Sequence, residues 1–232
     1  ITSIKIPETV TEIGEYAFYQ CKQVGGDLVI PNDVESIGAY AFQECTFDGK
    51  LVLSSSLKEI KDYTFTGCSY FNGKLSIPNN VKIIGKYAFQ GCVNFEVITF
   101  GSGLLKIEDY AFQDCYGLKG DLIIPDVTQE IGRKSFYNCS GFDKNLVIGS
   151  GIKSIGTYAF ALIRGVGGTQ DHILNFAKVY IKSKERPILS PRGVNEYSIF
   201  GGVIKYLGVP IGCKDNYLDK AWDAVLVEEI EF

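Results

Sequence analysis

The sequence predicts a repeat solenoid, built mainly from short β-strands with helical or 3-10 turns between them. Seven isoleucines recur at intervals of 23 or 24 residues, and a phenylalanine follows each of them five residues later. A steady period of this length is typical of stacked repeats, which bury a continuous core between neighbouring coils. The isoleucines are Ile13, Ile37, Ile60, Ile84, Ile107, Ile131 and Ile155.

Each repeat contains a short apolar segment of three residues that we interpret as a strand. In Leu28–Ile30 the alternation of a strand places the outer two side chains inward and the middle one outward. Proline follows four of these segments and lacks the N–H that a continuing ladder needs, so it ends the strand. The other segments are Ile4–Ile6, Leu51–Leu53, Leu75–Ile77, Ile98–Phe100, Leu122–Ile124 and Leu146–Ile148, and the prolines are Pro7, Pro31, Pro78 and Pro125.

The second half of each repeat carries the phenylalanine, with a small residue directly before it. A large ring beside a small side chain lets neighbouring coils interdigitate, so each coil buries its ring against the next. In six repeats a cysteine comes three residues after the phenylalanine, a spacing compatible with one helical or 3-10 turn. Five repeats have a glycine after the isoleucine, which indicates either a positive φ or a close backbone approach. These are Gly14, Gly38, Gly85, Gly132 and Gly156.

The cysteines fall at one phase of the repeat, which predicts a column of buried thiols. Adjacent rungs of a sheet lie ~4.8 Å apart, within the range of a disulfide, but side chains in one column point in parallel. We therefore expect free thiols, as is common for small buried cysteines. No Cys-x-x-Cys pair occurs, so no structural zinc site is expected. The column comprises Cys21, Cys45, Cys68, Cys92, Cys115 and Cys139; Cys213 lies outside it and is expected to be a lone thiol.

The period breaks after Phe160, so we divide the chain into repeats at 1–163 and a degenerate end with a cap at 164–232. Asp215–Ala224 has helical spacing, and Trp222 is expected to plug the last coil. A last coil exposes an apolar edge that must be covered, which favours an α+β cap. We expect strands at Val179–Ile181, Tyr206–Pro210 and Val225–Phe232, a degenerate repeat at Ser198–Phe200, and an irregular segment around Pro187 and Pro191.

Composition and motifs argue against several classes of function. The net charge of −4 and the pI near 5.2 give no basic field for nucleic acid, and no apolar run is long enough to span a membrane. The one histidine, His172, lies in a glycine-rich connection without the partners that a catalytic base requires. We therefore expect no catalytic residues, no cofactor and no metal.

Two outward-facing columns could bind a partner. The first is a column of tyrosines, which either stiffens the coil edge by packing or forms an aromatic stripe suited to a protein or glycan. The second is the middle position of the strands, where apolar side chains either form a contact patch or reflect the strand preference of β-branched residues. The tyrosines are Tyr16, Tyr40, Tyr63, Tyr87, Tyr110 and Tyr158, and the apolar strand residues are Val29, Val52, Ile123 and Val147.

The complete motif, represented by Ile30 to Cys45, resembles the BspA-type leucine-rich repeats of bacterial surface proteins. It reads strand, proline, two residues, an apolar residue, then I-G-x-x-A-F-x-x-C, and it covers residues 1 to about 163. Lys61, Ser135 and Ile163 depart from it without disturbing the architecture. The resemblance implies a right-handed superhelix of the leucine-rich-repeat type, an extracellular or cell-surface location, adhesive relatives and no catalytic residues to carry over.

From the repeats and the resemblance we predict a non-enzymatic cell-surface or secreted binding or adhesion module of a bacterium. Its ligand would be a host or matrix protein or a glycan. A structural spacer that displays another domain is the alternative, and an accessory domain of an enzyme is a third hypothesis. Since the chain begins at Ile1 within a repeat, we expect an upstream segment that could carry a lipid anchor.

Overall fold

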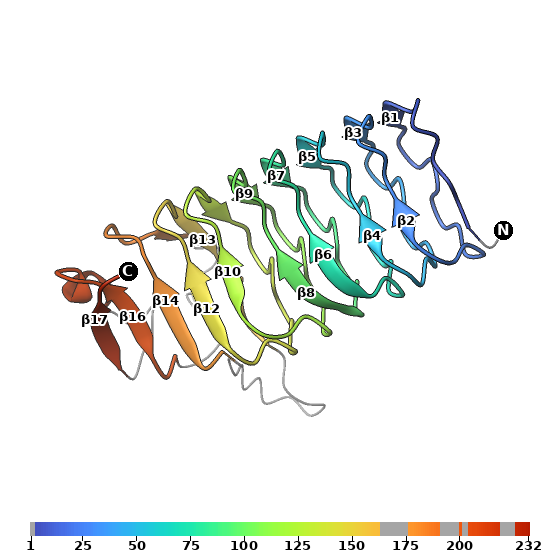
Figure 1. Cartoon of the computed structure of the whole chain (residues 1–232). Helices are drawn as coiled ribbons and strands as arrows, with labels where there is room; N and C mark the ends of the chain where they lie inside the picture. The colour runs from blue at the N-terminus through green and yellow to red at the C-terminus, as the bar shows by residue number, and fades with distance from the viewer. Residues whose placement is uncertain (1–2, 163–175, 191–199, 201–203, 219–225) are drawn as a thin grey trace.

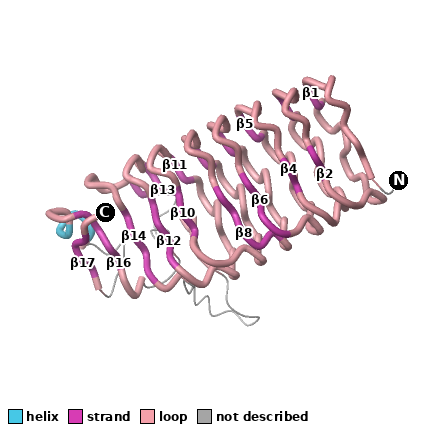
Figure 2. Tube along the Cα trace, in the orientation of Figure 1, coloured by secondary structure: helices cyan, strands magenta, loops and turns pink. Residues whose placement is uncertain are grey.

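The computed structural model describes residues 3–162, 176–190, 200, 204–218 and 226–232. The chain winds into coils that stack side by side along one axis, with strands on two sides of each coil (Figure 1). The predicted leucine-rich-repeat solenoid is therefore confirmed. Figure 2 shows that most of the described chain between the strands is loop and turn, and the only helical element there is η1 (Lys214–Tyr217).

The strands form two rows, one on each side of the stack. The first row contains β2 (Leu28–Val29), β4 (Leu51–Val52), β6 (Gly73–Ser76), β8 (Phe95–Thr99), β10 (Leu122–Ile124), β12 (Asn145–Ile148), β14 (Lys178–Ile181), β16 (Leu207–Pro210) and β17 (Val227–Ile230). The second row contains β1 (Glu12–Ile13), β3 (Ser36–Ile37), β5 (Glu59–Ile60), β7 (Ile83–Ile84), β9 (Lys106–Ile107), β11 (Glu130–Ile131), β13 (Ser154–Gly156) and β15 (Ile188–Ser190). All pairing is parallel and joins equivalent positions of successive coils, as between Leu122 and Leu146.

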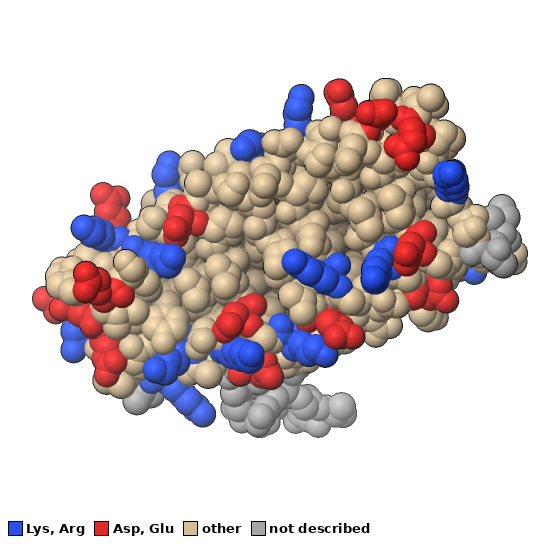
Figure 3. Space-filling view, viewed as in Figure 1, with Lys and Arg blue, Asp and Glu red and all other residues tan. Residues whose placement is uncertain are grey.

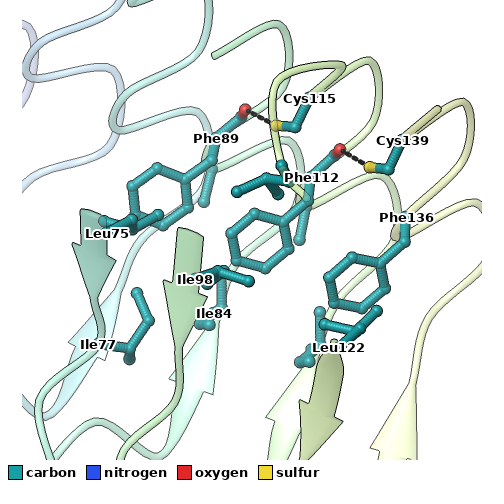
Figure 4. Packing of buried hydrophobic residues seen from close by; sticks show 14 of the residues in the cluster. Leu75, Ile77, Ile84, Phe89, Ile98, Phe112, Cys115, Leu122, Phe136 and Cys139 are labelled. Carbon is teal, nitrogen blue, oxygen red and sulfur yellow. Dashed lines mark hydrogen bonds between the residues drawn. The ribbon is translucent and has the colours of Figure 1, made fainter. Parts of the chain in front are cut away.

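The phenylalanine column forms the spine of the core. Rings of successive coils stack almost parallel, with centroids 5.0 Å apart for Phe18 and Phe42 and 5.3 Å apart for Phe65 and Phe89. Figure 4 shows Phe89, Phe112 and Phe136 in succession, with strand side chains such as Leu122 packed against them. A second phenylalanine column that the sequence analysis missed runs beside it through Phe47, Phe71 and Phe95.

The predicted helical or 3-10 turn between phenylalanine and cysteine is wrong. The cysteine N–H does donate to the phenylalanine carbonyl, at 3.1 Å from Cys21 to Phe18, but the residue before the cysteine has a positive φ. A positive φ at the third position of a four-residue turn defines a type II turn rather than a helical one. The positive-φ positions are Gln20, Glu44, Gly67, Gly91, Asp114 and Asn138.

After the first coil, the repeat glycines are required by the close approach of the preceding coil and not by a positive φ. A Cβ on Gly38 would lie 2.3 Å from the backbone nitrogen of Glu15 in the preceding coil, and Gly132 and Gly156 are equally crowded. The close approach is thus confirmed, and the alternative of a positive φ is wrong at this position. The positive φ occurs two residues later, at the tyrosine column, where Tyr63 has φ 58°.

The C-terminal strands largely match their predictions. β14, β16 and β17 lie within or beside the predicted segments, while β15 forms a strand where an irregular segment was expected. Of the predicted helix at Asp215–Ala224, the part before Leu218 belongs to η1. Residues 219–225, which include Trp222, lie outside the described residues, and so do His172, Ser198 and Ile199. The division at residue 163 stays a prediction; β12 pairs directly with β14 across it.

We expect Phe89→Ala to lower the free energy of unfolding by about 3–5 kcal/mol, because the ring is fully buried between two stacked rings. Phe18→Ala is the matched control, since Phe18 is only partly buried and belongs to the first coil of the described stack. Urea denaturation followed by circular dichroism measures both. An equal loss in the two variants would contradict the assigned role of stacking from both sides.

We expect Gly85→Ala to destabilise the protein by about 1–3 kcal/mol, because the new Cβ would lie 2.7 Å from the backbone nitrogen of Asp62. Gly14→Ala, at the same phase of the first repeat, has nothing within 4 Å of its Cβ and should change stability by less than about 0.5 kcal/mol. Thermal denaturation of the pair tests this difference. Similar midpoints would show that coil spacing does not select glycine here.

Candidate interaction surface

The middle residues of the first-row strands point outward and form what we call the strand face. Ile123 is 59% exposed, Val29 51% and Val52 46%, while Val147 is half-buried. Register brings Val29 beside Val52 and Ile123 beside Val147, so the four residues form two pairs. The pairs are separated by the polar Ser76 and Thr99, whose hydroxyls lie 3.4 Å apart.

Val97 adds an exposed apolar side chain between these pairs, and sequence reasoning missed it. It belongs to β8, which is longer than the other strands, and an irregularity in register at Gly73 and Lys74 places Val97 opposite Lys74. Its side chain is 41% exposed. The signal in the sequence was the longer strand, which adds a second outward position two residues before Thr99.

The strand face ends in a group of aromatic side chains that was also missed. Tyr180 follows Val147 in register, and its ring fills the space above Gly208 of the next strand. Tyr206 lies edge-to-face with Tyr180 at 5.7 Å, and the Lys178 ammonium lies 4.5 Å from the Tyr206 ring centre. These contacts place a rigid aromatic surface at the C-terminal end of the strand face.

The tyrosine column is a continuous stack of rings over its first five members. Ring centroids lie 4.6–4.8 Å apart from Tyr16 to Tyr110, with interplanar angles of 10° or less. The faces of the inner rings are therefore covered by their neighbours, and edges and hydroxyls remain for contact. At the end of the stack the Arg133 guanidinium covers Tyr110, and Lys134 occupies the column position before Tyr158. Tyr16 stands at the other end of the stack, where only Tyr40 stacks on its ring, and its side chain is 51% exposed.

The cysteines are free thiols, and the members of the column after Cys21 bond to the preceding coil, as Figure 4 shows for Cys115 and Cys139. From Cys45 onward, each Sγ of the column donates to the carbonyl of the phenylalanine one coil earlier, at 3.1 Å from Cys115 to Phe89 and 3.0 Å from Cys139 to Phe112. Burial raises the pKa of Cys92, Cys115 and Cys139 above the usual thiol value. A buried, protonated thiol is a poor nucleophile. Cys213 is also a free, buried thiol.

Carboxylate and amide side chains are likewise used between coils. Asp62 accepts the N–H of Lys86 at 2.7 Å, Asp109 that of Arg133 at 2.7 Å, and Asn79 that of Ser102 at 3.0 Å. The described residues contain no group of His, Cys, Asp or Glu that could hold a metal ion. Figure 3 shows Lys and Arg interspersed with Asp and Glu over the face in view. In the described part of the chain, no helix is long and apolar enough to cross a membrane.

Comparison with known proteins identifies the type of repeat. A family model for the BspA type leucine rich repeat region matches residues 1–119 and 72–165, with six copies. No curated protein matches the chain.

Among solved structures, a leucine rich cell surface protein from Faecalibacterium prausnitzii is 19% identical, with a TM-score of 0.53 over 100% of this chain and 80% of that one. The T. pallidum leucine rich repeat protein is 20% identical, with a TM-score of 0.50 over 94% and 74%. The pneumococcal vaccine antigen PcpA has the same identity and TM-score over 95% of this chain and 60% of its own. At these identities the likeness shows the fold alone.

We expect the cysteine column to resist thiol reagents in the folded protein. At pH 8 a maleimide should label Cys21, which is partly exposed, and leave Cys68, Cys92 and Cys115 unmodified, since they are fully buried and thiolates react rather than thiols. Mass spectrometry of the labelled peptides reads this directly, and labelling in urea is the control. Rapid labelling of Cys92 in the native protein would contradict the packing described above.

Proposed function

Since the chain belongs to the BspA-type leucine-rich repeat family, we propose that it is a non-enzymatic binding or adhesion module of a bacterial cell surface or secreted protein. Its strand face engages a host or matrix protein or a glycan. The observation that carries this proposal is the exposure of Val29, Val52 and Ile123, with Val97 between them, on a regular sheet surface. Exposed apolar side chains gathered on one face are typical of interaction sites.

The strand face suits a partner better than the tyrosine column does. A glycan ring packs on the open face of an aromatic ring, and the inner tyrosines have none, because neighbours cover both sides. We therefore propose that Tyr40, Tyr63 and Tyr87 chiefly hold the coils together. Tyr16, at the exposed end of the stack, and the hydroxyl edge of the column remain available to contribute to binding.

The aromatic end of the strand face supports the same proposal. Aromatic side chains are enriched where partners bind, because they bury a large area with few rotatable bonds. Tyr180 and Tyr206 are half-buried and fixed by contact with one another, and Phe232 beside them is 52% exposed. A partner lying along the strand face would therefore meet Ile123, Val147 and then this aromatic group.

A spacer that displays another domain is the second candidate, and the regular stacking favours it. The same phenylalanine contact repeats from Phe18 to Phe160 and continues to Phe200, with centroid distances of 5.0–5.7 Å. Such repetition makes a stiff rod whose length is set by the number of coils. A spacer needs no ligand, so the two candidates differ in a binding experiment.

To test the proposal, we would screen the protein against matrix proteins and a glycan array, and then compare two variants. The first carries lysine at Val29, Val52, Ile123 and Val147. The control carries lysine at Ile83, Leu105 and Val127, which are 37–43% exposed outside the strand face. We expect the first variant to lose binding by at least about tenfold and the control to bind like the wild type.

Circular dichroism melts of both variants separate loss of binding from unfolding. Undiminished binding by the first variant would exclude the strand face as the site. A protein that binds nothing in the screen, while remaining folded, would favour the spacer.

A further inference from the structure

A hollow lies between two neighbouring turns near the C-terminal end of the stack. One turn joins β12 to β13, and the other joins β14 to β15 (Figure 1). Register pairs Ile148 with Ile181 and Ile155 with Leu189, so the second turn is one residue longer than the first. The hollow of about 660 Å³ between the turns is lined by Ser150, Lys153, Lys182, Lys184, Arg186 and Ile188, among others.

The hollow carries an excess of positive charge. Of its lining residues four are basic and only Glu185 is acidic. Lys182 lies 3.5 Å from Asp126, and the Lys153 ammonium donates to the amide oxygen of Gln129 at 2.9 Å. These neighbours offset part of the charge of Lys182 and Lys153, and the lining itself holds four basic residues against one acidic residue in a chain whose total charge is −4. The equivalent turns at the N-terminal end instead carry the exposed acids Glu8, Asp33 and Glu35.

An apolar side chain stands at the edge of this basic hollow. Ile188 is 70% exposed, and it pairs in register with the polar Ser154 of the preceding coil. A side chain of this size exposed beside several cations is unusual for a solvated turn, where the apolar surface would gain from being covered. The basic side chains and the exposed apolar surface together suit a ligand that carries both acidic groups and an apolar group.

Side chains of η1 donate hydrogen bonds to the backbone of the longer turn. Tyr217 donates from its hydroxyl to the carbonyl of Ser183 at 2.8 Å, and Asn216 donates from its side-chain amide to the carbonyl of Lys184 at 3.2 Å. The Ser183 hydroxyl donates to the carbonyl of Glu185 at 2.7 Å. The backbone that carries the cations is thus fixed before a ligand arrives, which lowers the entropy cost of binding.

We propose that this hollow binds an acidic protein segment that carries an apolar side chain. Carboxylates of the segment pair with Lys153, Lys184 and Arg186, and its apolar side chain covers Ile188. A sulfated polysaccharide would use the same cations, but it would leave Ile188 exposed, so the protein segment accounts for both observations. The hollow is formed by turns and not by the strand face, so this second site stands whether or not the strand face binds a partner.

Fluorescence anisotropy with labelled synthetic peptides tests this site in the whole chain. One peptide has several Glu residues around a single Leu, a second replaces that Leu with Ser, and dextran sulfate serves as the polysaccharide probe. We expect the Lys184→Glu/Arg186→Glu double variant to bind the first peptide at least about tenfold more weakly. Ile188→Ser should weaken the first peptide several-fold and leave the second unchanged.

Matched controls lie in other coils of the same surface. Lys58→Glu/Lys82→Glu reverses the charge of two exposed lysines, of which Lys82 occupies the same turn position as Lys153. Ile83→Ser changes a residue that occupies the same position of the second strand row as Ile188. Both control variants should bind the peptide like the wild type. The lysine variant of the strand face should also retain peptide binding.

Several results would overturn the proposal. They are no binding of the acidic peptide by the wild type, equal losses in the control lysine variant, or tight dextran sulfate binding with no effect of Ile188→Ser on any probe. The last result would assign the hollow to a polysaccharide.

Discussion

The structure depends on backbone hydrogen bonds that run from each coil to the next at equivalent positions. They join turns as well as strands: Tyr63 donates to Lys86 at 2.8 Å, Phe65 to Ala88 at 2.8 Å and Gly67 to Gln90 at 2.7 Å. Because the bonded positions recur at every coil, each side chain must fit against the side chain at the same phase of its neighbours. The repeated isoleucine, alanine, phenylalanine and cysteine are consequences of that constraint.

The same constraint engages many of the polar and aromatic side chains of the chain in contacts between coils. The thiols of the cysteine column from Cys45 onward donate to carbonyls of the preceding coil, and Asp62 and Asp109 accept backbone N–H groups of the following coil. The inner tyrosines cover one another's faces. What remains free to vary are positions that point away from the stack, such as Val97 and Ile123 on the strand face and Ile188 beside the basic hollow. Both proposed sites therefore consist of residues that break the repeat pattern or face outward from it.

Much of the fold could be predicted from the sequence, because a strict period reports the stacking directly. The strands, the phenylalanine column and the free thiols all follow from one phase relation. The turn geometry could not be predicted in the same way, since a positive φ at a tyrosine contradicts local preference and is stabilised by bonds to another coil, such as that from Tyr63 to Lys86. The exposure of Val97 and of Ile188 was likewise missed, because both depend on an irregular strand length or turn length relative to a neighbouring coil.

Hydrogen exchange of the turn amides tests most directly whether coil-to-coil bonding organises the whole molecule. In an ordinary exposed turn these amides exchange quickly, whereas here Phe65 and Phe89 donate to carbonyls of the next coil, as the strand residue Leu28 does. If coil-to-coil bonding organises the molecule, the amides of Phe65 and Phe89 exchange as slowly as those of the central strands, through the same cooperative opening. Fast exchange of these turn amides beside protected strands would contradict it.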